Sequence, residues 1–182
     1  MSCASVNGMG EENSDLIATR LCGSCGLCCN GVLFHLVRLQ TGDLISELAR
    51  LGLKIKRKKG CDQFSQPCPA YQNSHCTIYL QRPTRCRRFE CRQLQGVIAG
   101  EFQEEGAMMK IKEVQERVQR IDSLMNALGK TDMRRPLTKR YEKIIAECID
   151  LSNEELIFKQ ELEEQMTELQ MILDRDFRLE QK

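Results

Sequence analysis

Four cysteines within eight positions are the residues of this sequence best suited to chemistry. They are Cys22, Cys25, Cys28 and Cys29, with the spacing C-x2-C-x2-C-C. Two thiols separated by two residues can hold one metal ion, because the intervening pair forms a tight turn that glycines at 23 and 26 permit. A third cysteine at the same interval extends the turn, as in the C-x2-C-x2-C run of bacterial ferredoxins. The motif therefore predicts a metal or iron–sulfur site.

Further cysteines downstream enlarge this set of ligands. They are Cys61, Cys68, Cys76, Cys86 and Cys91. Tetrahedral zinc uses four thiolates, and a [4Fe–4S] cluster also uses four. Nine thiols therefore suit two sites with one spare cysteine, or one site with several thiols left over. Zinc, an iron–sulfur cluster, or both remain open as cofactors, and His35 and His75 are additional candidate ligands.

The number and placement of the cysteines favour thiolate ligands over disulfides. The chain has eleven cysteines, an odd number, and its first fifteen residues contain no basic and apolar pattern of a secretory signal. Adjacent Cys28 and Cys29 rarely satisfy disulfide geometry with each other. No run approaches 18 apolar residues, so we expect no membrane span and a cytoplasmic location.

Arginines surround the last two cysteines of the set. Arg82, Arg85 and Arg87 lie closest to Cys86, and Arg88 and Arg92 follow. Guanidinium groups can neutralise anionic sulfur and orient the ligands, and they can equally bind a phosphate, a substrate carboxylate or nucleic acid. Nucleic acid is disfavoured, because a single Phe interleaves this segment and no stacking platform is evident. The basic run at 54–59 is most often a solvated loop.

Other catalytic signatures are missing from the sequence. It contains no C-x3-C-x2-C radical-SAM pattern, no phosphate-binding glycine loop and no H-E-x-x-H zinc motif. No single cysteine is distinguished as a nucleophile by a neighbouring histidine. Catalytic residues are therefore not identifiable from the sequence.

The elements that must position the thiols are short and irregular. Residues 1–14 are polar and predicted to be disordered, with Cys3 a free thiol, and residues 15–21 could form one helical turn. Residues 31–39 suit a strand or the start of a helix, and apolar spacing predicts a helix over 44–51 that Gly52 ends. Residues 61–92 leave little room for regular structure, so we expect ligation to set their geometry.

The C-terminal part has a different pattern. Apolar residues recur at helical spacing from 111 to 128 and again in a second helix after Pro136, where Cys148 is predicted to be a core thiol. Ser152 and Glu155 form a capping box that opens a third helix. These helices predict an antiparallel hairpin or bundle. Residues 1–100 contain 13 Lys and Arg against 7 Asp and Glu, whereas residues 101–182 contain 14 against 19. We expect a mainly α fold with little β, divided into residues 1–14, a cysteine-rich domain at 15–100 and a helical tail at 101–182.

The cysteine pattern resembles a known family. The C-x2-C-x2-C-C motif, Gly60-Cys61, and the run from Cys76 to Cys91 that reads C-x-I-Y-x-x-R-P-x-x-C-R-x-F-x-C are similar to the YkgJ-like cysteine-cluster proteins, a largely bacterial family described as zinc- or iron-chelating. The resemblance covers about 22–91 and implies that eight cysteines are ligands: Cys22, Cys25, Cys28, Cys29, Cys61, Cys76, Cys86 and Cys91. Cys68 lies in an insertion specific to this chain.

The sequence thus predicts an intracellular metal-binding protein that acts on or with a partner protein. The alternatives are a cluster-dependent modifying enzyme and a structural zinc adaptor. Some longer members of the family resemble lysine methylases, but this chain shows no recognisable SAM-binding loop. A redox catalyst that uses spare thiolates is the other enzymatic alternative.

Overall fold

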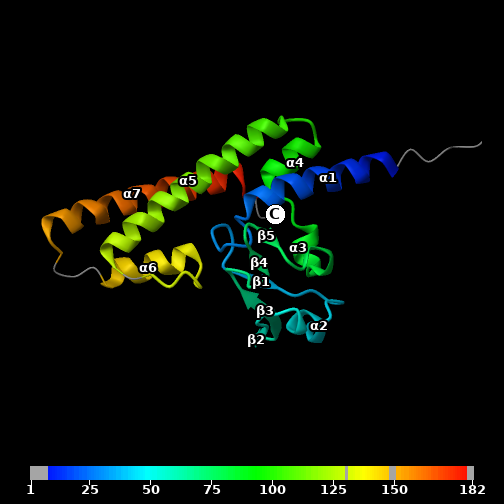
Figure 1. The fold of residues 1–182 in the computed structure, drawn as a ribbon, viewed down its shortest axis with the longest axis horizontal. Helices are drawn as coiled ribbons and strands as arrows, with labels where there is room; N and C mark the ends of the chain where they lie inside the picture. Colours follow the sequence, from blue (N-terminus) through cyan, green and yellow to red (C-terminus); the bar gives the residue numbers. More distant parts are fainter. Residues whose placement is uncertain (1–7, 130, 148–150, 180–182) are drawn as a thin grey trace, which may run out of the picture.

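The protein is mainly α-helical, as the sequence predicts, with two small antiparallel sheets between the helices (Figure 1). This computed structural model describes residues 8–129, 131–147 and 151–179, with the side chains of 8–15 outside that description. Cys3 and Cys148 therefore lie outside the described residues. The elements, in order, are α1 (Gly8–Cys25), β1 (Leu36–Arg38), α2 (Ile45–Arg50), β2 (Lys56–Lys58), β3 (Cys61–Ser65), β4 (Tyr71–Gln72), β5 (His75–Cys76), a 3-10 turn (Tyr79–Gln81), α3 (Thr84–Arg88), α4 (Arg92–Ile98), α5 (Glu104–Leu128), α6 (Leu137–Glu147) and α7 (Asn153–Asp176).

The long helices α5 and α7 form the predicted antiparallel hairpin. Arg120 pairs with Glu161, Arg117 with Glu168, and Lys110 with Asp176, so residue numbers rise on one helix as they fall on the other. Ser152 and Glu155 form the predicted capping box at the start of α7, and Gly129 caps α5. Local sequence signals therefore define the ends of both helices. None of the described helices has the length and apolarity of a membrane span.

The segment 61–92 contains more regular structure than the sequence indicates. Strand β3 lies between β1 and β2 in a three-stranded sheet, and β4 pairs with β5 in a second sheet. These strands have two to five residues each. Their hydrophobic alternation is too short to stand out among cysteines and prolines. Helix α1 likewise begins at Gly8, inside the stretch 1–14 that was expected to lack structure.

Two hydrophobic cores organise the fold. The larger core joins the loop after α1 to the helices of the tail, and Leu27, Ile121 and Leu169 are fully buried in it. The smaller core lies under the three-stranded sheet and includes Val37, Leu48 and Phe64. The larger core contains residues on both sides of the predicted boundary at 100, and the division into domains stays a prediction. Six of the thiols pack against one core or the other: Cys25, Cys28 and Cys91 against the larger, and Cys68, Cys76 and Cys86 against the smaller.

Candidate metal centre

The C-x2-C-x2-C-C motif folds as a helix end followed by a tight turn. Cys22 and Cys25 occupy the last turn of α1, and Gly26 then takes a left-handed conformation with φ of 65°. The carbonyl of Gly26 accepts hydrogen bonds from the amides of Cys29 and Asn30, both at 2.9 Å. This turn reverses the chain, so that the later cysteines of the motif return towards the helix end.

The other cysteines reach the same region from separate elements. Cys76 lies on β5, Cys86 on α3, and Cys91 immediately before α4. The amide of Cys68 donates a hydrogen bond of 2.8 Å to the carbonyl of Cys29, which ties the segment before β4 directly to the motif. Because no two of these positions share an element, their proximity depends on the tertiary fold.

A single cavity of about 220 Å³ collects most of these thiols. The cysteines that line it are Cys22, Cys25, Cys28, Cys29, Cys76, Cys86 and Cys91. Seven thiols around one cavity create a strongly sulfur-rich environment, the donor chemistry that zinc and iron–sulfur centres use. Where their positions are described, all of these cysteines are free thiols and none forms a disulfide.

Two sets of three thiols pack against different cores, and we call each set a quartet together with the remaining motif cysteine whose pKa it influences, Cys22 or Cys29. The first quartet is Cys22, Cys25, Cys28 and Cys91. Burial, together with the nearby sulfurs of Cys91 and Cys22, raises the pKa of Cys25 to about 12. Burial also raises the pKa of Cys28 well above its ordinary value, with further increases from Cys25, Cys29 and Cys91. Cys25, Cys28 and Cys91 pack against the larger core.

The second quartet is Cys29, Cys68, Cys76 and Cys86. Burial, and then the sulfurs of Cys68, Cys86, Cys76 and Cys22 in that order, raise the pKa of Cys29 to about 12. The pKa of Cys86 is also raised to about 12, first by burial and then by Cys68. Cys68, Cys76 and Cys86 pack against the smaller core. This grouping puts Cys28 in the first quartet and Cys29 in the second, and the two quartets are close neighbours, since Cys29 also raises the pKa of Cys28 and Cys22 that of Cys29.

Cys61 lies apart from both quartets. It begins β3, is exposed, and pairs across the sheet with Lys58. Phe64 of the same strand is buried against the smaller core. Because strand residues alternate between faces, Cys61 and Phe64 point to opposite sides of the sheet. The structure thus does not bring this predicted ligand to the cavity, whereas it brings Cys68, the cysteine outside the family pattern, beside Cys29.

Arg82 is the cation most closely associated with the thiols. It lines the cavity, and its positive charge lowers the pKa of Cys22 in the first quartet and of Cys86 in the second, against the larger effect of burial. The guanidinium lies 3.6 Å from the centroid of the Tyr79 ring, and its Nε donates a hydrogen bond of 3.0 Å to the Tyr79 carbonyl. The cation–π contact and this hydrogen bond fix the guanidinium beside the cavity. The sequence did not indicate the role of Tyr79.

The other predicted arginines and histidines differ in their positions. Arg85 lines the cavity, whereas Arg87 is exposed and its charge acts on Asp43. His75 also lines the cavity, and its Nδ1 lies 3.1 Å from the carbonyl of Asn73. His35 contacts Thr138 of α6 through a short hydrogen bond. Of the two histidines, His75 is the one that the fold places beside the thiols.

Most of the thiols line one cavity, but they do not surround a single point within it. Among the described residues, no three His, Cys, Asp or Glu side chains are placed so that they could hold one metal ion together. Burial and repulsion from neighbouring sulfurs oppose the charge of Cys25 and Cys29 when no cation is present, which is why the pKa values of these two thiols are raised. A thiolate-binding cation would remove that penalty, so the donor set fits zinc or iron.

This arrangement defines a cysteine-rich metal-binding protein. Residues 21–116, slightly more than half of the chain, match the CxxCxxCC family, described as "Putative zinc- or iron-chelating domain". The chain belongs to this family. No match was found among curated proteins or among solved structures.

Proposed function

We propose that the chain holds two separate thiolate-coordinated centres, each made of zinc, iron or an iron–sulfur cluster. The first quartet would hold one centre and the second quartet the other. The observation that carries the proposal is geometric: Cys25, Cys28 and Cys91 pack against the larger core, Cys68, Cys76 and Cys86 pack against the smaller core, and the Cys68 amide bonds to the Cys29 carbonyl. Adjacent side chains can serve two centres, because they leave the backbone in different directions.

The chain's own residues supply the charge balance of these centres. Four thiolates around a divalent ion leave a net charge of −2, so two such centres in one cavity repel each other. Arg82 lies close enough to Cys22 and Cys86 to act on both quartets. Its guanidinium would offset part of this repulsion and donate hydrogen bonds to sulfur, which orients the ligands.

Metal analysis of single-cysteine variants tests the proposal. Protein is expressed with zinc and iron both available, purified without oxygen, and analysed for zinc, iron and sulfide per chain. Cys25→Ser should remove the centre of the first quartet, and Cys76→Ser that of the second. Each variant should therefore lose roughly half of the bound metal, because each quartet requires all four thiolates. Cys61→Ser is the matched control and should retain the full content.

Two results would contradict this assignment. One is a Cys61→Ser protein that loses as much metal as the quartet variants, since Cys61 would then be a ligand. The other is a Cys25→Ser protein that loses all of its metal while remaining folded by circular dichroism, because the thiols would then form one centre. Broad absorption in the violet and blue together with acid-labile sulfide identifies a cluster, and colourless protein with bound zinc identifies zinc.

A second comparison tests the role of Arg82. Arg82→Ala should speed the loss of metal from both centres to a chelator, whereas Arg87→Ala, a neighbouring exposed arginine, should leave it unchanged. Arg82→Lys retains the charge without the planar group that lies over Tyr79, so it should restore retention in part. Equal retention in all three variants would exclude Arg82 from the charge balance.

A further inference from the structure

The outer face of the three-stranded sheet is strongly basic. Strand register places Arg38 of β1 and Lys56 of β2 on either side of Gln63 of β3, and Lys58 lies opposite Cys61. Side chains at alternate strand positions share a face, so Lys56 and Lys58 lie on the same side, and Lys54, which precedes the strand, lines the same hollow as both. We call the surface made by Arg38, Lys54, Lys56 and Lys58 the basic face. Phe64 and Val37, which point the other way, are buried in the smaller core.

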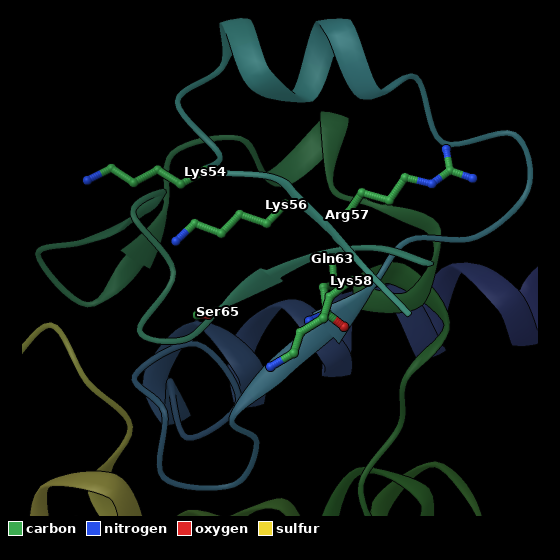
Figure 2. A pocket seen from close by; sticks show the side chains of 6 residues that line it. All are labelled: Lys54, Lys56, Arg57, Lys58, Gln63 and Ser65. Atoms are coloured by element: carbon green, nitrogen blue, oxygen red, sulfur yellow. The ribbon is translucent and has the colours of Figure 1, made fainter. Parts of the chain in front are cut away.

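No acidic side chain of the sheet neutralises this surface. Arg57 points to the opposite side and pairs with Asp62 at 3.9 Å, the acidic residue of β3. In the part of the chain that the structure describes, no ion pair involves a residue of the basic face. Figure 2 shows Lys54 and Lys56 extending to one side while Arg57 extends away from them. All four cations are exposed, and Lys54, Lys56 and Lys58 line a shallow hollow together with Arg57, Gln63 and Ser65.

The hollow lies at an open edge of the sheet. The strand order is β1-β3-β2, and β2 pairs with β3 alone among the described strands. All residues of β2 are exposed. A terminal strand has backbone amides and carbonyls that another extended chain can use. Its alternate lysines are spaced at about 6.6 Å, which is also the spacing of alternate side chains on any added strand.

We propose that β2 binds an extended acidic segment of a partner protein, which adds to the sheet as a further strand. Backbone hydrogen bonds to β2 would supply the register, and glutamate or aspartate at alternate positions would lie opposite Lys54, Lys56 and Lys58. Nucleic acid fits the surface less well, because the basic face presents no aromatic side chain on which bases could stack. The surface contains none of the thiols of the two quartets, so this binding does not depend on the metal centres.

Peptide binding to the full-length protein tests this proposal by fluorescence anisotropy. The probe is a labelled peptide in which glutamate alternates with threonine; its control has the same composition with the glutamates in one block. Strand addition requires alternation and free amides, so the alternating peptide should bind roughly fivefold or more tightly than the block peptide. N-methylation of alternate amides on the edge that faces β2 should abolish its binding.

Charge reversal identifies the binding surface. Lys54→Glu, Lys56→Glu and Lys58→Glu together should weaken binding by about tenfold or more, because each exposed ion pair contributes a factor of up to about five. The reversed charges still protect the open edge from aggregation, and the triple variant should bind an alternating lysine peptide instead. Lys56→Glu alone should already weaken binding, and its matched control Lys112→Glu, on the exposed face of α5, should leave binding unchanged.

Several results would overturn the proposal. They include no saturable binding of the alternating peptide up to about 1 mM, a limit that corresponds to a very weak complex. In that case the lysines serve only to keep the edge from pairing with other chains. Equal affinity for the alternating and block peptides would show unspecific attraction. Tighter binding of a single-stranded oligonucleotide of equal charge would assign the surface to nucleic acid.

Discussion

Replacement of Gly26 by alanine should disrupt the turn that carries the thiol motif. Gly26 has a φ of 65°, and a Cβ at this position would lie 1.8 Å from the Tyr71 hydroxyl oxygen and 2.4 Å from the ring carbon that bears it. The left-handed conformation costs an alanine about 1–2 kcal/mol. Forcing the half-buried Tyr71 ring aside costs a further ~1–3 kcal/mol. We therefore expect the free energy of unfolding to fall by about 2–5 kcal/mol.

Gly23, three residues earlier in the same motif, provides the matched control. It lies within α1, and a Cβ there would meet no atom within 4 Å. Alanine favours helix over glycine by up to about 1 kcal/mol, so Gly23→Ala should leave the protein equally or more stable. The midpoint of urea unfolding, followed by circular dichroism, compares the variants under one fixed metal concentration, because bound metal itself adds to stability.

A double-mutant cycle separates the two contributions at Gly26. Tyr71→Ala removes the ring, so Gly26→Ala in that background should cost only the backbone share of about 1–2 kcal/mol. Tyr71→Phe retains the ring carbon that lies 2.4 Å from the added Cβ, so it should not remove the steric cost of Gly26→Ala. The reasoning fails if Gly26→Ala and Gly23→Ala have the same effect, or if Tyr71→Ala leaves the cost of Gly26→Ala unchanged.

Three further substitutions probe contacts that hold the rest of the fold. Arg140 of α6 is 4% exposed and pairs with Asp122 of α5 at 2.6 Å. Because Asp122→Ala leaves this buried charge unpaired, it should lower the free energy of unfolding by about 3 kcal/mol in urea titration. A loss under about 1 kcal/mol would contradict this expectation. Burial raises the pKa of Asp43, but hydrogen bonds from Gln40 and Thr84 outweigh it and the pKa is lowered. The contribution of the Asp43 carboxylate to the free energy of unfolding should therefore be complete above its unfolded pKa of about 3.9. It should be lost as pH falls through the lower pKa of the folded state, and Asp43→Asn should remove this acid dependence from unfolding curves. Ser152→Ala removes the cap of α7 and should lower the free energy of unfolding by about 1 kcal/mol. An unchanged melting temperature would contradict this expectation.

The helices of the tail were predictable because their signals are local. The capping box at Ser152 and the glycine at 129 mark ends that depend on neighbouring residues alone. The strands at 61–76 were not predicted, since each gains its stability from a partner strand rather than from its own two to five residues. The overall mainly α class follows from the long helices, whose periodicity extends over several turns.

The cysteine set was predictable as a set, whereas its division was not. Spacing identified nine candidate thiols, but their grouping depends on which sulfurs the tertiary fold brings together, as the hydrogen bond from Cys68 to Cys29 illustrates. One signal was available in the sequence. In the segment from Cys61 to Ser65, Phe64 is the apolar residue, so two-residue alternation places Cys61 on the opposite, solvent-facing side. The basic character of that side follows from the same alternation in β2.

The junction between Cys28 and Cys29 connects the metal centres to the architecture of the whole chain. Leu27, the preceding residue, is fully buried in the larger core beside the tail helices, whereas the carbonyl of Cys29 holds Cys68, which packs against the smaller core. The peptide bond between Cys28, which packs against the larger core, and Cys29, which holds Cys68, therefore connects the two cores. If each quartet holds its own centre, each centre would brace a different core, and removal of either would loosen one half of the protein more than the other. Hydrogen exchange of Cys25→Ser and Cys76→Ser should show this difference: the first variant should lose protection in α5 and the second in β3. Uniform loss across both cores would instead indicate that all of the thiols share one centre.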